Sequence, residues 1–167
     1  MRKPPLANQA SVKLIAVLLG LMVIFNLFIM PTLTGDQAAT PLDLQFAYTP
    51  EQAYQLIDSY SAETRQQYII GEMTKDLAYP IVYTLFMSLS LALLLPQKWK
   101  LAWLPYTIFF FDILENIGII TLLINYPNKL ITVAWCTSVF SSLKWTMVAV
   151  VTVIIFIGLV RKIGTKR

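Results

Sequence analysis

Polar side chains interrupt two long apolar stretches of this sequence: Asp112, Glu115 and Asn116 lie in one stretch, and Lys144 lies in the next. An Asp or a Lys at the centre of a membrane-spanning helix costs about 2.5 to 3.5 kcal/mol on insertion scales. Ionisable groups in such a setting often transfer protons or bind charged ligands. These residues are therefore the first candidates for chemistry.

The spacing of these residues predicts that they meet. Asp112, Glu115 and Asn116 follow the i, i+3, i+4 pattern, which places them on one face of a helix. Lys144 lies at a similar depth in the following apolar stretch, so we expect it to form an ion pair with one carboxylate. The second carboxyl group should then be protonated or hydrogen-bonded, for example by Asn116.

Further polar residues extend this candidate site. Asp76, Tyr79 and Tyr83 share a face at i, i+3 and i+7, and Ser141 lies one turn before Lys144. We expect a polar cavity that opens to the outside, with the acids at its floor. Structural contacts between helices are the alternative for Ser141, and packing is the alternative for the two tyrosines. The ligand-binding candidates are Asp112, Glu115, Asn116, Lys144, Ser141, Asp76, Tyr79 and Tyr83.

Several chemistries find no support in the sequence. The chain has no histidine, and its one cysteine, Cys136, excludes an internal disulfide and a CxxC motif. Phosphate-loop, dinucleotide and HExxH motifs are also absent, so we expect no metal site and no cofactor. Ser141 and Lys144 match the S-x-x-K spacing of penicillin-interacting enzymes but lack the companion motifs. The basic residues flank apolar runs, which argues against a nucleic-acid partner.

The composition predicts an all-α chain embedded in a lipid bilayer. Hydrophobic residues make up 57% and charged residues 13% of the 167 residues, against roughly 45–50% and 25% in soluble proteins. A bilayer core about 30 Å thick needs roughly 20 apolar residues as helix. Short, turn-rich connections indicate one domain, residues 1–167, forming an antiparallel four-helix bundle. The expected spans are about 12–30, 76–95, 101–124 and 130–160.

Basic residues predict the orientation through the positive-inside rule. Nine would lie on the cytoplasmic side and three outside, so we expect a multi-pass inner-membrane protein with cytoplasmic termini. We also expect the first span to be retained, because it is long for a signal peptide. The cytoplasmic group is Arg2, Lys3, Lys13, Lys98, Lys100, Arg161, Lys162, Lys166 and Arg167, and the outer group is Arg65, Lys75 and Lys129.

The expected outer loop, residues 31–75, is predicted to be irregular over residues 31–48 and helical in parts after that. Thr49 with Pro50 and Gln52 has the pattern of a capped helix start. Ser61 before Ala62 and Glu63 is a second start, from which helical spacing continues into the second span. The short helix after Thr49 could be a lid on the bundle or a passive spacer.

Three segments together resemble a group of small bacterial four-span membrane proteins. They are Asp76-x-x-Tyr79-Pro80-x-x-Tyr83, Asp112-x-x-Glu115-Asn116 and Phe140-x-x-x-Lys144. The resemblance implies an inner-membrane setting and brings no activity. The layout is also similar, in architecture alone, to the sterol-isomerase and sigma-2 receptor superfamily.

Three functions are compatible with these patterns. The first is binding of a lipid or a small amphipathic molecule, including a cationic one, in the intramembrane cavity. The second is acid–base catalysis on a lipid-soluble substrate by the same carboxyl groups. The third is a structural or partner-binding subunit that uses the outer loop. The oligomeric state does not follow from the sequence.

Overall fold

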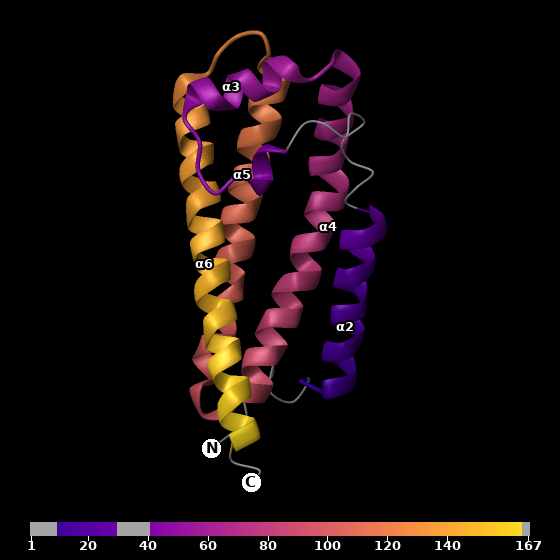
Figure 1. Ribbon diagram of the computed structural model, residues 1–167, viewed down its shortest axis with the longest axis vertical. Coiled ribbons are helices and arrows are strands. Elements are labelled where there is room, and N and C mark those ends of the chain that lie inside the picture. Colours follow the sequence, from indigo (N-terminus) through magenta and orange to yellow (C-terminus); the bar gives the residue numbers. More distant parts are fainter. Residues whose placement is uncertain (1–9, 30–40, 165–167) are drawn as a thin grey trace.

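The structure is a computed structural model that describes residues 10–29 and 41–164. These residues form helices and no strands (Figure 1). The elements in chain order are α2 (Val12–Ile24), the π-helical turn η1 (Phe25–Ile29), the 3-10 helix η3 (Leu42–Leu44), α3 (Pro50–Ser59), α4 (Ala62–Leu94), the 3-10 segment η4 (Pro96–Trp103), α5 (Pro105–Asn125) and α6 (Ile131–Gly164).

Four helical stretches are long and apolar enough to cross a membrane, as expected: Val12–Ile29, Ala62–Leu94, Pro96–Asn125 and Ile131–Gly164. The helix that holds the second predicted span is longer than that span. Its N-cap is Ser61, whose hydroxyl accepts a hydrogen bond from the amide of Thr64 at 3.0 Å. Residue 30, where we expected the first span to end, lies outside the described residues.

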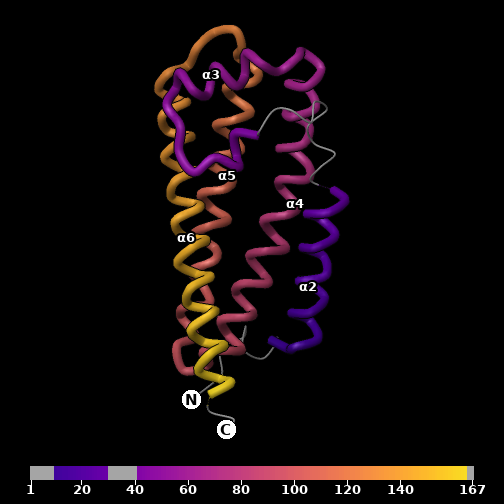
Figure 2. Tube along the Cα trace, viewed as in Figure 1, coloured from indigo at the N-terminus to yellow at the C-terminus, as the bar shows by residue number. Residues whose placement is uncertain are grey.

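The helices lie alongside one another, and two ends of the molecule can be distinguished (Figures 1 and 2). The start of α2, the segment η4 and the end of α6 lie at one end, called the η4 end here. The helix α3 and the turn between α5 and α6 lie at the other, the α3 end. The most extensive helix contacts join α5 to α6 and α4 to α5, whereas α2 packs mainly on α4.

Close approach of α5 and α6 depends on a glycine. A Cβ atom at Gly118 would overlap the side chain of Thr137 on α6. Since helix pairs approach closely in membranes where small residues face each other, Gly118 permits the contact. This contact places Lys144 of α6 beside the acidic face of α5.

The helix α3 covers the ends of α5 and α6. Its start is the predicted capping box, in which Thr49 and Gln52 each bond the other's backbone amide. Its buried face, including Ala53 and Ile57, belongs to a cluster with residues of α5 and α6. The Tyr54 hydroxyl also accepts a hydrogen bond from the amide of Leu130, just before α6. The helix is therefore packed on the bundle as an integral part.

Residues 42–48, called the returning segment here, run from η3 along α6 towards α3. We expected this part of the loop to be irregular and assigned it no role. Serines of α6 bond its backbone: the Ser142 hydroxyl donates to the Phe46 carbonyl at 2.9 Å, and the Ser138 hydroxyl accepts from the Tyr48 amide at 2.9 Å. Buried backbone groups need such partners when water is excluded. The polar stripe of α6 thus holds the returning segment inside the bundle.

Candidate functional site

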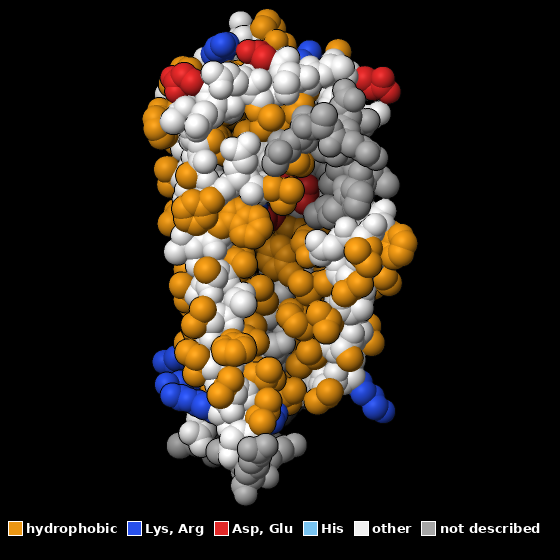
Figure 3. All heavy atoms as spheres, in the orientation of Figure 1, with side chains coloured by type: hydrophobic (Ala, Val, Ile, Leu, Met, Phe, Trp, Pro, Cys, Tyr) orange, Lys and Arg blue, Asp and Glu red, His pale blue; other side chains and the backbone are white. Residues whose placement is uncertain are grey.

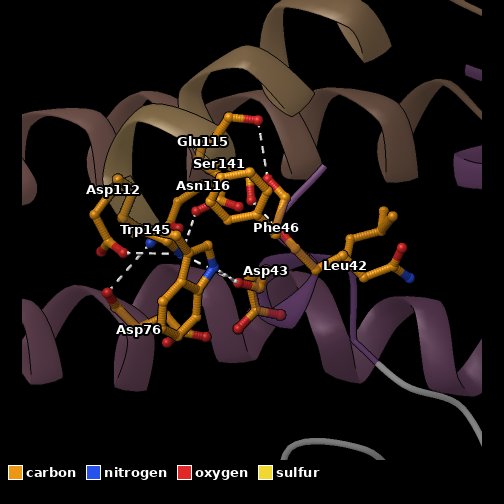
Figure 4. A network of polar contacts seen from close by, with 12 residues as sticks. Leu42, Asp43, Phe46, Asp76, Asp112, Glu115, Asn116, Ser141 and Trp145 are labelled. Atoms are coloured by element: carbon orange, nitrogen blue, oxygen red, sulfur yellow. Dashed lines mark hydrogen bonds and ion pairs between the residues drawn. The ribbon is translucent and has the colours of Figure 1, made fainter. Parts of the chain in front are cut away.

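Lys144 forms the predicted ion pair with a carboxylate of α5 and also a second one, which we did not expect. Its ammonium nitrogen lies 3.3 Å from Asp112 Oδ1 and also pairs with Glu115 Oε2 (Figure 4). All three side chains are buried, and Glu115 is fully buried. The ammonium also donates to the backbone carbonyl of Asp43 at 3.2 Å. These three contacts use the full donor capacity of the ammonium group.

Asn116 has a different partner from the one we expected. Its amide nitrogen donates to the backbone carbonyl of Asp76 at 3.2 Å. In an α-helix this carbonyl would accept from the amide of residue 80, but Pro80 has no N–H. Asn116 therefore supplies the hydrogen bond that Pro80 cannot. This hydrogen bond joins α4 to α5 and has a structural role.

Asp43 enters the site from the returning segment. Its carboxylate Oδ1 accepts from the Tyr68 hydroxyl at 2.7 Å, and its carbonyl accepts from the Trp145 indole at 3.2 Å. In the sequence, Asp43 stands in the expected outer loop, where apolar residues alternate with it and with Gln45, and this alternation did not indicate that its carboxylate lies inside the bundle. Figure 4 shows Asp43 facing Asp76 of α4 and Trp145 of α6.

A second group of acids lies beside the ion pairs. Asp43, Glu72 and Asp76 each place one carboxylate oxygen within 4.8 Å of the others. Glu72 is 2% exposed, and neither of its carboxylate oxygens has a hydrogen-bond partner among the described residues. From the sequence we included Asp76 in the candidate site and left out Glu72, although the i, i+4 spacing puts both on one face of α4.

Ser141 acts on the backbone. Its hydroxyl donates to the carbonyl of Gln45 in the returning segment. Since the Lys144 ammonium is occupied by two carboxylates and a carbonyl, it is not arranged as a base for this hydroxyl. The S-x-x-K spacing therefore reflects attachment of the returning segment, and Ser141 has a structural role.

A cavity of about 560 Å³ adjoins these groups. Five of the eight candidate residues line it: Asp76, Tyr79, Tyr83, Asp112 and Lys144. Glu115, Asn116 and Ser141 are not part of the lining. The remaining lining is mostly apolar and comes from α2, η1, η3 and its N-cap, α4 and α6: Met22, Asn26, Pro41, Asp43, Leu44, Tyr68, Pro80, Met87, Trp145 and Val148.

The side of the molecule between α2 and α6 is hollowed (Figure 3). Acidic side chains are visible in the depth of the hollow, and apolar side chains surround it and continue below it. On the α4 wall, the rings of Tyr79 and Tyr83 meet edge to face with centroids 5.5 Å apart. The Tyr79 hydroxyl accepts a hydrogen bond from Asn26 at 2.7 Å. This contact connects η1, which continues α2, to the α4 wall of the cavity.

Tyr48 of the returning segment is a buried neighbour of the site. Burial, reinforced by the nearby Glu115 carboxylate, raises the pKa of its hydroxyl well above the usual value. The hydroxyl is therefore neutral at physiological pH, and it has no hydrogen-bond partner among the described residues.

Searches against protein-family models, curated proteins and solved structures found no match to this chain.

Proposed function

We propose that this chain is an inner-membrane protein that binds a lipid or a small amphipathic molecule in the cavity between α2 and α6. The polar head of the ligand would face Asp76, Asp112 and Lys144. Its apolar part would lie against Met87 and Val148 and extend towards the bilayer.

The observation that carries this proposal is the composition of the cavity wall. Ionisable groups gather at one part of a lining that is otherwise mostly apolar. The volume of about 560 Å³ falls within the range of roughly 300–1,000 Å³ that small-molecule sites have. Since α2 packs mainly on α4 and makes few or no contacts with α6, a ligand could enter from the lipid phase between α2 and α6.

The topology that we propose is an antiparallel four-helix bundle with both termini in the cytoplasm and the α3 end outside. Its support is the excess of basic residues near the η4 end and the chain termini. A fluorescent protein fused after Arg167 should fluoresce in cells, and a reporter that requires the periplasm should be inactive there. The opposite pattern would reverse the orientation and leave the cavity proposal unchanged.

Native mass spectrometry of the full chain, extracted in a mild non-ionic detergent, tests the binding proposal. The wild-type protein should carry a bound lipid or small molecule. Met87→Trp should fill the apolar part of the cavity and reduce the bound fraction at least fivefold. Leu85→Trp is the matched control, because Leu85 is exposed on the same helix and is not part of the lining.

A second variant tests the polar part of the cavity. Asp112→Asn should weaken retention or change the class of ligand that copurifies, whereas Glu63→Gln removes a charge at an exposed position of α4 and should not. If wild-type protein carries no ligand, or if Met87→Trp and Asp112→Asn keep the wild-type ligand content, the proposal fails.

Acid–base catalysis is the second candidate function. Asp112 and Lys144 both line the cavity and lie 3.3 Å apart, so a proton acceptor and a proton donor would face the same bound molecule. This function predicts chemical turnover of the copurified ligand that Asp112→Asn abolishes in a folded protein. Binding alone predicts a ligand that is released unchanged.

A further inference from the structure

The cluster of Asp43, Glu72 and Asp76 has a geometry that the ion pairs with Lys144 do not explain. Glu72 and Asp76 stand one turn apart on α4, and Asp43 comes from η3. One oxygen from each carboxylate lies within 4.8 Å of the other two. Oxygen ligands of Ca²⁺ lie about 2.3–2.6 Å from the ion, so two ligands can be separated by up to about 5 Å. The separations therefore suit a shared cation.

Glu72 provides a separate indication of a ligand. Its side chain is 2% exposed, and both carboxylate oxygens lack a hydrogen-bond partner among the described residues. A buried carboxylate without a partner is strongly unfavourable. Lys144 is the one buried Lys or Arg of the described residues, and its ammonium already contacts Glu115, Asp112 and the Asp43 carbonyl. If Glu72 is ionised, its partner must therefore come from outside this part of the chain.

The chemistry of the donors selects the class of partner. All three are carboxylates, which are hard oxygen ligands that suit Ca²⁺, Mg²⁺ and Mn²⁺. Asp43 and Asp76 also line the cavity, so water can complete the coordination shell. We propose that Asp43, Glu72 and Asp76 bind one divalent cation of this oxygen-preferring class and thereby fasten η3 to α4.

This proposal replaces our expectation of no metal site. That expectation rested on the absence of histidine and of cysteine motifs, whereas this ligand set is formed by carboxylates from two separate segments. The cation site shares Asp76 with the proposed ligand site, but each site also has a residue that the other lacks. Glu72 belongs to the cation site and not to the cavity lining, whereas Asp112 lines the cavity and is not in the cluster.

Terbium luminescence provides a direct test with the full chain in non-ionic detergent. The indole of Trp145 donates to the Asp43 carbonyl, so Tb³⁺ at the site would lie close enough to receive energy from this ring. We expect saturable emission with one ion per chain, displaced by Ca²⁺ or Mn²⁺. Electron paramagnetic resonance of added Mn²⁺ should show the same single site without a trivalent probe.

Glu72→Gln preserves the shape of the side chain and should weaken Tb³⁺ and Mn²⁺ binding more than tenfold. Glu63→Gln, which removes the same charge at an exposed position of the same helix, should bind as wild type does. If Glu72→Gln does not fold, Asp43→Asn takes its place, because the Asn oxygen can still accept from Tyr68. Asp43→Asn should also weaken binding more than tenfold.

Two results would overturn the cation site. One is the absence of saturable Tb³⁺ and Mn²⁺ binding to wild-type protein, in which case the three carboxyl groups share protons. The other is unchanged affinity in Glu72→Gln or Asp43→Asn. The proposed function is tested separately. Asp112→Asn should weaken retention of the ligand or change its class, and should keep the cation. Met87→Trp should reduce the bound ligand whether or not Glu72→Gln loses the cation.

Discussion

The two halves of the molecule bury different kinds of side chain. In the α3 half, residues 41–76 and 112–144, the interior contains four acidic side chains and one lysine: Glu72, Asp76, Asp112, Glu115 and Lys144 are all buried. In the η4 half, residues 83–108 and 147–164, the buried cluster is largely aliphatic and includes Leu91, Ala102, Ile108 and Val151.

This difference determines how many specific contacts each half needs. Aliphatic side chains pack in many arrangements of similar energy, whereas a buried charge is tolerated only with a partner at short distance. The α3 half therefore needs an additional segment, residues 42–48, to complete its polar contacts. The η4 half needs no such segment. Substitutions should accordingly cost more in the α3 half, and the following predictions test this asymmetry in order of expected effect.

The largest effect should come from Lys144→Met. The substitution leaves Asp112 and Glu115 buried without a positive partner, and breaking a buried ion pair from one side costs about 3–5 kcal/mol. Unfolding in SDS and thermal denaturation should both show the loss. Adding Asp112→Asn and Glu115→Gln should recover much of it. Lys98→Met in the η4 half, at an exposed position, should change stability little. A loss of stability as large as that of Lys144→Met would contradict the proposed difference between the halves.

Glycine substitutions compare helix packing in the two halves. Gly118→Ala should cost about 1–3 kcal/mol, because the new Cβ overlaps Thr137 and forces α5 and α6 apart. Gly158→Ala places its Cβ 3.2 Å from Leu94 Cβ and 3.5 Å from Leu95 Cγ, so a small shift of the neighbouring helix relieves the contact and its cost should be smaller. Thermal unfolding of both variants measures the difference. An equal or larger loss in Gly158→Ala would contradict the comparison.

A double-mutant cycle tests the bond between Asn116 and the Asp76 carbonyl. Asn116→Leu should cost about 1–3 kcal/mol, because it leaves a buried carbonyl without a donor. In a Pro80→Ala background, the amide of residue 80 can bond this carbonyl, and the cost of Asn116→Leu should fall. Equilibrium unfolding of the four proteins gives the coupling energy. Additive losses would show that Asn116 does not compensate for the proline.

The smallest effect should come from Thr49→Ala, which removes the N-cap of α3. The loss of an N-cap costs about 1 kcal/mol, but the exposed cap acts on a helix that is also held by its buried Ala53, Tyr54 and Ile57. Hydrogen exchange should accelerate in the first turn of α3 and remain unchanged in α5. Global loss of protection would mean that α3 stabilises the whole α3 half more than its contacts indicate.

The sequence predicted the parts of this site that lie on regular helices. The facing positions of Asp112, Glu115 and Lys144 followed from helical spacing and from short connections between neighbouring helices. The capped starts of α3 and α4 followed from Thr49 and Ser61, because capping depends on residues that are close in the sequence. All of these predictions are confirmed by the structure.

The contacts that were not predicted join segments far apart in the chain. The Asn116 amide was expected to serve a carboxylate and instead bonds a carbonyl that Pro80 leaves free. Ser141, a ligand candidate, donates to the Gln45 carbonyl of the returning segment, a contact that we did not predict. In both cases the residue type indicated a polar contact, but several acceptors were available to it, and the backbone path decided among them.

By itself, the sequence determined that four helices of this chain are long and apolar enough to cross a membrane, because length and hydropathy are properties of each segment alone. It also determined which helix faces carry charge. The tertiary structure decided that Asp43 returns to Glu72 and Asp76 and that a cavity remains between α2 and α6. Those outcomes depend on how a loop segment packs against helices distant in the sequence, which no local pattern encodes.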